Sequence, residues 1–257
     1  MSELLDLALH LADIADAITL DKFTSRAFDV ERKIDASEVT DVDRASECAM
    51  RETVVARRPD DGFYGEEYGR LNTDAQLQWI VDPIDGTSNF VRGLPVWATL
   101  IALVHDEVPT IGVVSAPALG RRWWAERGLG AFVNGSPIKV SEVSSLERAH
   151  VSITHSRGWS ELGLTPRLVD LQSTAERSRG FGDFWQHMLV AEGAIDVAID
   201  AIGLQPYDNA ALYPIVTEAG GKISDRFGVS SWRSNSQIST NSALHDVVID
   251  ALCGMEQ

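Results

Sequence analysis

One stretch of the sequence, residues 78–90, restricts the possible folds more than any other part of the chain. Trp79-Ile80-Val81 is bulky and β-branched, which predicts a buried strand. Pro83 lacks a backbone N–H and favours extended geometry in the residue before it, so we expect the strand to end there. Asp85-Gly86-Thr87-Ser88 has the composition of a turn that enters a helix, with Asp85 or Thr87 as its cap. Two carboxylates, Asp82 and Asp85, should therefore lie at the end of a buried strand.

The chemistry of this stretch suits a cation and a phosphate. A helix N-terminus offers free N–H groups and a partial positive charge, which favour an anion such as a phosphate group. Two carboxylates beside it suit Mg²⁺, which takes a few carboxylate and phosphate oxygens and keeps several waters. An isolated pattern of this kind is also typical of a plain strand–turn–helix junction with a capping Asp. Partners elsewhere in the chain must decide between these interpretations.

The composition limits the class of protein and of partner. The 257 residues allow one large domain or two modest ones, and 44% hydrophobic with 23% charged residues predicts a globular chain with a substantial core. With 22 Lys and Arg against 38 Asp and Glu, the formal net charge is −16, which argues against nucleic acid and an anionic membrane as partners. A small phosphorylated ligand remains possible, because bound cations can reverse the local field.

Several features predict a soluble, cytoplasmic protein. The two cysteines, Cys48 and Cys253, have no zinc or redox spacing, so we expect free thiols. Residues 1–20 contain four acids and lack the basic segment of a signal peptide. The longest apolar runs, such as residues 96–104, are too short to span a bilayer.

Hydrophobic periodicity predicts alternating helices and strands. In the first half we expect helices over residues 3–20 and 40–58, strands over 63–65, 79–82, 96–104, 110–115 and 121–126, and a hairpin at Asn134-Gly135. In the second half we expect strands over 149–153, 195–199 and 238–241, and helices over 166–175, 183–191, 209–219 and 243–252. A polar stretch, residues 141–148, predicts a boundary between an N-terminal α+β domain, 1–145, and a C-terminal α/β domain, 146–257.

Other acids of the chain suggest a site only when they are considered together with residues 78–90. Glu66 and Glu67 follow a short aromatic strand, and Glu66 together with Asp82 and Asp85 would supply enough carboxylate for two cations. Taken alone, adjacent glutamates are usually solvated. Asp208 by itself is typical of a helix N-cap and Asp43 of an ordinary acid in a first helical turn.

Residues 182–187 also allow two interpretations. Asp183 and Gln186 have the spacing of a capping box. The alternative is a second helix N-terminus facing a ligand, with Trp185 and His187 shaping a pocket.

The combined motifs resemble a known family. Gly65-Glu66-Glu67, the stretch Asp82 to Phe90, the hairpin 130–135, Tyr207-Asp208 and residues 218–221 follow one another as in the inositol monophosphatase family, over nearly the whole chain. The resemblance implies an α/β (α+β) fold, a layered αβαβα sandwich of the inositol monophosphatase and fructose-1,6-bisphosphatase type. It also implies Mg²⁺-dependent hydrolysis of a phosphate monoester by direct attack of a metal-activated water.

The resemblance assigns roles to residues of this chain. Two or three Mg²⁺ ions would be held by Glu66, Asp82, the Ile84 carbonyl, Asp85 and Asp208. Asp43, Glu66 and Thr87 would be the catalytic residues, with Asp43 and Thr87 orienting the water, while Gly86, Thr87 and Ser88 would bind the phosphate. A homodimer is also implied.

Departures from the family pattern point to the substrate. Family members that act on inositol phosphate carry Gly-Ser-Ala-Ala where this chain has Gly182-Asp183-Phe184-Trp185, which would fill the space for the ring and add a carboxylate. Tyr207 replaces the usual Trp, and Asp200 lies one residue out of step with the family's hydroxyl-binding acid.

Gly182 to His187 looks like the histidinol-phosphate phosphatases of this family found in actinobacteria. This resemblance implies hydrolysis of L-histidinol 1-phosphate in histidine biosynthesis, with Asp85, Asp183, Gln186 and His187 binding the substrate. Asp183 would pair with a cationic group, and Gln186 or His187 would shape the imidazole pocket. The alternatives are an inositol-1-monophosphatase or broad sugar-phosphate phosphatase, and a metal- and phosphate-binding protein without turnover.

Overall fold

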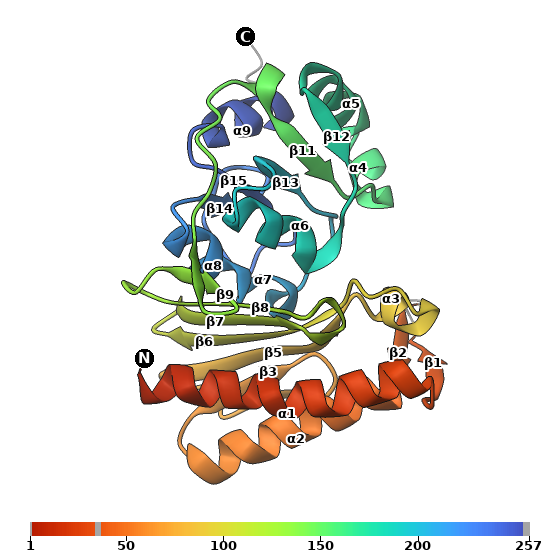
Figure 1. The fold of residues 1–257 in the computed structure, drawn as a ribbon, viewed down its shortest axis with the longest axis vertical. Helices are drawn as coiled ribbons and strands as arrows, with labels where there is room; N and C mark the ends of the chain where they lie inside the picture. The colour runs from red at the N-terminus through yellow and green to blue at the C-terminus, as the bar shows by residue number, and fades with distance from the viewer. Residues whose placement is uncertain (1, 34–36, 254–257) are drawn as a thin grey trace.

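Layers of helices and two β-sheets alternate through the molecule (Figure 1). The computed structural model describes residues 2–33 and 37–253. Helices α1 (Glu3–Ser25) and α2 (Asp41–Arg57) cover the outer face of the first sheet. Helices α6 (Asp183–Ala191), α7 (Pro206–Asn209) and α8 (Leu212–Glu218) lie between the two sheets. Helices α4 (Arg157–Glu161), α5 (Thr165–Thr174) and α9 (His245–Cys253) pack on the far side of the second sheet. The predicted αβαβα sandwich is confirmed.

The first sheet has eight strands in the order β10-β9-β8-β7-β6-β5-β3-β4. Its strands are β3 (Gly62–Gly65), β4 (Gly69–Leu71), β5 (Leu77–Asp85), β6 (Ala98–His105), β7 (Val108–Ala116), β8 (Arg121–Glu126), β9 (Ala131–Val133) and β10 (Ser136–Ile138). Both faces are buried, so its central strands are apolar throughout. In β5, Trp79 and Val81 pack towards α1 and α2, whereas Ile80 packs towards α6 and α8, as the period of two requires.

The second sheet has five strands in the order β12-β11-β13-β15-β14. Its strands are β11 (His150–Ile153), β12 (Arg177–Arg179), β13 (Val197–Ile199), β14 (Lys222–Ser224) and β15 (Ile238–Thr240). Strand β13 runs parallel to β11 and antiparallel to β15, so the C-terminal end of β13 and the N-terminal end of β15 lie at the same end of the sheet. Helix α6 begins near that end, which faces the first sheet (Figure 1). A separate ribbon, β1 (Val30–Arg32) with β2 (Glu38–Thr40), precedes α2.

The helix expected over residues 3–20 continues to Ser25, and two predicted boundaries close to the site were also wrong. Strand β5 does not end at Pro83 but continues to Asp85, because a bulge between Asp82 and Asp85 lets the ladder with β6 resume at Asp85. The helix expected over 209–219 is two helices, α7 and α8, separated at Ala210 and Ala211. The expected cap of the helix after β5 was also wrong: α3 (Thr87–Arg92) is preceded by Gly86, and neither Asp85 nor Thr87 caps it.

The predicted boundary at residue 145 falls between the last strand of the first sheet and the first strand of the second. One apolar cluster includes residues of both sheets together with α6 and α8, so we retain the two-domain division only as a proposal. Across residues 2–33 and 37–253, no helix is both long and apolar enough to cross a membrane.

Candidate active site

The bulge in β5 sets the centre of the site. Asp82 is almost fully buried, and its Oδ1 accepts the Ile84 backbone N–H at 3.0 Å, which fixes the carboxylate against the bulge. The Thr99 hydroxyl donates to the Pro83 carbonyl at 2.8 Å and holds the bulge from the neighbouring strand. Asp82, Asp85 and Asp208 each present one carboxylate oxygen, and these atoms lie within 4.8 Å of one another. The structure therefore brings together three of the predicted ligands.

Asp43 and Thr87 also meet, although 44 residues separate them. Asp43 is the third residue of α2 and forms a capping box with Thr40, because its Oδ2 accepts both the Thr40 N–H and the Thr40 hydroxyl. Its Oδ1 faces the Thr87 hydroxyl at 3.3 Å, and that hydroxyl donates to the Ile84 carbonyl at 2.9 Å. Asp43 thus uses one oxygen for its helix and directs the other towards the end of β5.

Asp208 likewise binds the start of its own helix. It is the third residue of α7, and its Oδ2 accepts the Gln205 N–H at 2.7 Å. The expectation of an N-cap at Asp208 was wrong by three positions, because Gln205 occupies the cap. Tyr207 lies beside the acids, and its ring meets Tyr64 edge to face at 5.8 Å.

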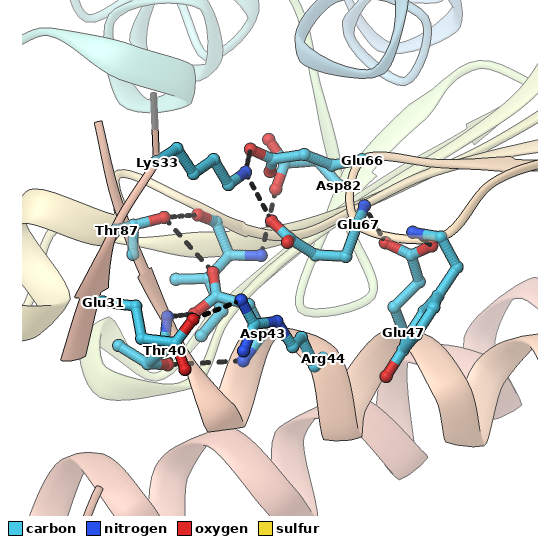
Figure 2. Close-up of polar contacts among 12 residues, drawn as sticks. Glu31, Lys33, Thr40, Asp43, Arg44, Glu47, Glu66, Glu67, Asp82 and Thr87 are labelled. Carbon is cyan, nitrogen blue, oxygen red and sulfur yellow. Dashed lines mark hydrogen bonds and ion pairs between the residues drawn. The ribbon is translucent and has the colours of Figure 1, made fainter. Parts of the chain in front are cut away.

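Glu66 is held at the site by the loop that carries it. The Glu47 carboxylate accepts the Glu67 N–H at 2.7 Å and the Tyr68 N–H at 2.9 Å. A Cβ at Gly65 would come within 2.0 Å of Glu47 Oε1, so this glycine is required for the close approach. The Lys33 ammonium lies between the two glutamates, 2.7 Å from Glu66 and 2.6 Å from Glu67 (Figure 2).

The electrostatics of the cluster are unfavourable without a cation. Burial, together with neighbouring carboxylates, raises the pKa of Asp82 and of Asp85 well above the usual range. Burial raises the pKa of Asp208 to about 7 and that of Asp43 to about 6. Burial also raises the pKa of Glu66, although contact with Lys33 opposes this shift. Carboxyl groups in such surroundings favour protons or other positive charge.

The donor set therefore fits a divalent cation. All the donors are oxygens, which are the ligands that Mg²⁺ prefers. The position of Lys33 against Glu66 indicates that the cluster attracts a positive group, here an ammonium. The Ile84 carbonyl, which already accepts from Thr87, keeps a second lone pair for a further ligand.

The predicted phosphate-binding residues lie at the start of α3, beside Asp85. Gly86 has φ +82°, and a Cβ there would meet the Val96 carbonyl oxygen at 3.0 Å, so any other residue would be strained at this position. Thr87 and Ser88 form the first turn of α3, where backbone N–H groups have no partner within the helix. The start of α3 offers these N–H groups to an anion.

Helix α6 connects the second sheet to the site. The Phe184 N–H donates to Asp85 Oδ2 at 2.7 Å, so Asp85, a member of the acid cluster, also binds the start of α6. The predicted capping box of Asp183 with Gln186 was wrong: Gly182 is the cap, and no side-chain bond closes it. Asp183 instead adopts φ +48° and accepts a hydrogen bond from Asn89 Nδ2 at 2.9 Å.

The other predicted substrate-binding side chains point elsewhere. Phe184 is buried in the core against Trp123, so it does not fill the ring space as expected. Gln186 is fully buried and bonds Ser152 and Thr154 through its amide. His187 is fully buried, with Nε2 3.0 Å from Asp200 Oδ2 and Nδ1 2.8 Å from Ser239 Oγ. Neither Gln186 nor His187 has a free polar atom facing the acids.

Sequence reasoning missed three groups that support the site. Lys33 and Glu47 stand in polar segments without a motif, and only the fold brings them to Glu66 and its loop. Asn89 lies within residues 78–90, but the sequence gives no sign of its role. Its hydrogen bond to Asp183 joins residues that are 94 positions apart in the chain. No sequence signal identifies such pairs, because tertiary structure alone makes them neighbours.

Comparisons with known proteins agree with this geometry. A histidinol-phosphatase from Mycobacterium tuberculosis is 48% identical over 251 residues, covering 96% of this chain and 96% of the relative. One from Streptomyces coelicolor is 42% identical over 257 residues, with the same coverage of both chains. The solved structure of extragenic suppressor protein suhB from Bartonella henselae superposes with a TM-score of 0.90 at 29% identity, covering 98% of this chain and 99% of that one.

The IMPase of Thermotoga maritima superposes with a TM-score of 0.88 at 30% identity, covering 98% of this chain and 97% of that one. A family model described as the inositol monophosphatase family matches residues 1–256. The resemblance inferred from the motifs is thereby confirmed, and the chain belongs to the inositol monophosphatase family.

Proposed function

We propose that this protein is a divalent-cation-dependent phosphatase that hydrolyses histidinol phosphate. The observation that carries the proposal is the double role of Asp85. Asp85 belongs to the acid cluster, and its Oδ2 accepts the Phe184 N–H, which brings Asp183 at the start of α6 close to that cluster. The similarity to histidinol-phosphatases over 96% of the chain supports the choice of substrate.

The proposed metal site uses the residues that the family resemblance implied. Asp82, Asp85 and Asp208 would hold the cations, with Glu66 and the Ile84 carbonyl completing the set. When bound there, divalent cations neutralise the phosphate charge and acidify a water. Every other step falls to the protein's own groups.

Asp43 and Thr87 would orient the attacking water. Because the Thr87 hydroxyl donates its proton to the Ile84 carbonyl, its lone pairs are left to accept from a water. Asp43 Oδ1, on the other side of that hydroxyl, would accept the water's proton as the bond from the water oxygen to phosphorus forms. The bond from phosphorus to the ester oxygen would break in the same step, and the alcohol would leave with a proton taken from solvent water. The N–H groups of Gly86, Thr87 and Ser88 would hold the phosphate for in-line attack without a covalent intermediate.

Asp183 would bind a cationic group of the substrate. It lies at the N-terminus of α6 with Asn89 bound to one oxygen, which leaves the second oxygen for an ammonium or an imidazole N–H. Gln186 and His187 were expected to contact the substrate directly. Because both side chains are buried and fully paired, we propose that they hold neighbouring residues of the second sheet in position and do not contact the substrate.

We extend the proposal to properties that the family resemblance implied. The cation is Mg²⁺, in two or three sites, and a donor set made only of oxygens supports a hard ion. The protein acts in the cytoplasm as a homodimer within histidine biosynthesis. The free thiols of Cys48 and Cys253 are in keeping with a reducing compartment.

The decisive experiment compares substrates. Phosphate release is measured from histidinol phosphate and from inositol 1-phosphate, each with Mg²⁺ and with excess chelator. We expect higher kcat/KM for histidinol phosphate and no release with chelator. Faster turnover of inositol 1-phosphate would support the inositol phosphatase instead, and chelator-insensitive release would refute the metal site. No release from either ester would favour the binding protein without turnover.

Asp183→Ala tests the selectivity. Loss of the carboxylate should lower kcat/KM for histidinol phosphate at least about tenfold more than for β-glycerol phosphate, which has no cationic group, since a charge-assisted hydrogen bond contributes about 1.5–3 kcal/mol. Asp183→Asn serves as the matched control, because it removes the charge but keeps a hydrogen-bonding group of the same size. Equal losses for both esters would show that Asp183 has only a structural role, through its contact with Asn89.

A further inference from the structure

The amide of Gln237 is buried near the proposed site. Gln237 is 1% exposed, and neither its Oε1 nor its Nε2 has a hydrogen-bond partner in the part of the chain that the structure describes. Leaving a buried amide unpaired destabilises the folded protein, so it needs an explanation. By contrast, the amide of Gln186, which is also fully buried, is paired at both atoms.

The position of Gln237 relates this amide to the substrate. Its carbonyl accepts the Asp200 N–H at 2.9 Å, which continues the ladder between β13 and β15 past Ile199 and Ile238. Residues opposite each other in an antiparallel ladder point to the same face, so the side chains of Gln237 and Asp200 share one face. Ser239 is two residues further and lies on that face as well.

That face is turned towards α6. His187 of α6 contacts both Ser239 and Asp200, so the side chains on this face point at the helix that begins with Asp183. Gln237 immediately precedes β15, and Asp200 immediately follows β13. Both therefore lie at the end of the sheet that is nearest the start of α6. The unpaired amide therefore lies at the same end of the sheet as Asp183.

His187 fixes the Asp200 carboxylate in place. An ionised carboxylate can only accept, so His187 Nε2 is the donor to Asp200 Oδ2, at 3.0 Å. The Ala201 N–H donates to the other oxygen at 2.7 Å. Each oxygen keeps a lone pair, and no basic side chain pairs with Asp200 apart from His187 among the described residues. A second cationic or N–H donor can therefore bind it.

We propose that Asp200 and Gln237 form the part of the site that binds the nitrogen-bearing end of the substrate, with His187 as a positioning residue. This inference rests on the proposed function. Asp200 accepts from the ammonium or from an imidazole N–H. The Gln237 amide, which has both a donor and an acceptor free, bonds the remaining nitrogen or the water that accompanies it. An anionic group would be repelled here by Asp183 and Asp200, so the phosphate must point away, towards α3.

The first test replaces Gln237 by Leu, which has a similar size and no polar atom. The measured quantity is the ratio of kcat/KM for histidinol phosphate to kcat/KM for β-glycerol phosphate. We expect Gln237→Leu and Asp200→Asn each to lower this ratio more than about tenfold, mainly through KM. A smaller change in both variants overturns the proposal.

The melting temperature gives an independent check on Gln237. Removing an unpaired buried amide should leave it unchanged or raised, whereas Gln186→Leu, the matched control, should lower it because Ser152 and Thr154 lose their partners. Equal destabilisation by the two substitutions would mean that Gln237 is already paired, through a buried water, and would overturn its assignment as a ligand group.

A second pair of variants tests His187. The longer side chain in His187→Gln places an amide near the position of Nε2 and keeps a donor to Asp200, whereas His187→Asn reaches only the position of Nδ1, near Ser239. Each variant breaks one buried contact, so a purely structural role predicts equal effects. We expect the selectivity ratio to survive in His187→Gln and to fall in His187→Asn. Equal losses overturn the positioning role.

The substrate preference of the parent protein distinguishes a failure of this inference from a failure of the proposed function. If the parent prefers inositol 1-phosphate, the proposed function fails and the inference fails with it. If the parent prefers histidinol phosphate while Asp200→Asn and Gln237→Leu retain that preference, only the subsite is wrong.

Discussion

Replacing Asp43 by Asn should change how the stability of the metal-free protein depends on pH. Asp43 is 1% exposed, and burial raises its pKa from 3.8 to about 6, with the charges of Glu66 and Glu67 adding to the rise and contacts with Thr40 opposing it. Between these values the folded protein keeps a proton that the unfolded chain has lost. The stability from this group is therefore complete below pH 3.8 and is lost as the pH rises through about 6.

The magnitude follows from the shift. About two pKa units correspond to about 3 kcal/mol of unfolding free energy. From pH 4.5 to pH 7.5 the protein should lose about 2 kcal/mol of this amount, because part of it has already disappeared by pH 4.5. Asn keeps an oxygen that can accept the Thr40 N–H, so the start of α2 remains capped while the titration is removed.

Urea unfolding in excess chelator, at pH 4.5 and pH 7.5, measures the effect. The stability of Asp43→Asn relative to the parent should rise by about 2 kcal/mol between the two conditions. Asp41→Asn, at an exposed position in the same turn of α2, controls for the loss of a charge at the helix N-terminus. A relative stability that differs by less than about 0.5 kcal/mol between the two pH values would refute the reasoning.

Two further predictions concern the rest of the site. Gly86→Ala should cost roughly 1–3 kcal/mol in urea unfolding and lower kcat, because Ala must adopt φ +82° with its Cβ 3.0 Å from the Val96 carbonyl oxygen; an unchanged stability and kcat would contradict this. Mg²⁺ should raise the melting temperature more at pH 8 than at pH 5, because burial raises the pKa of Asp208 to about 7 and protons compete for the cluster below it. Asp208→Asn should reduce the Mg²⁺-induced shift at pH 8, as measured by calorimetry, and an equal shift in both proteins would contradict the ligand role.

Most of the fold could be predicted from periodicity and turn residues. Strand β8 has the expected bounds, Arg121 to Glu126, because its residues read as one short pleated run. The hairpin at Asn134-Gly135 joins β9 to β10 as expected, since φ is positive at both residues. Pro83 misled the prediction because a bulge accommodates a residue without an N–H inside a strand, and pairing resumes beyond it.

The acid cluster could be predicted, but its surroundings could not. Asp82 and Asp85 lie on one strand, so their proximity follows from local geometry, and a motif series implied Asp208. Contacts such as Asn89 with Asp183 or His187 with Asp200 depend on how α3, α6 and β13 are placed in space. The sequence around Gln237 carries no motif, and only its burial without a partner draws attention to it.

Asp43 and Asp208 each bind the backbone at the start of a helix and also belong to the site. A nascent or partly folded chain lacks both helix starts, so it holds these two acids in no fixed direction. The complete cluster comes into existence only when α2 and α7 have docked against β5. A chain in which α2 and α7 have not yet docked therefore offers no complete acid cluster to a cation.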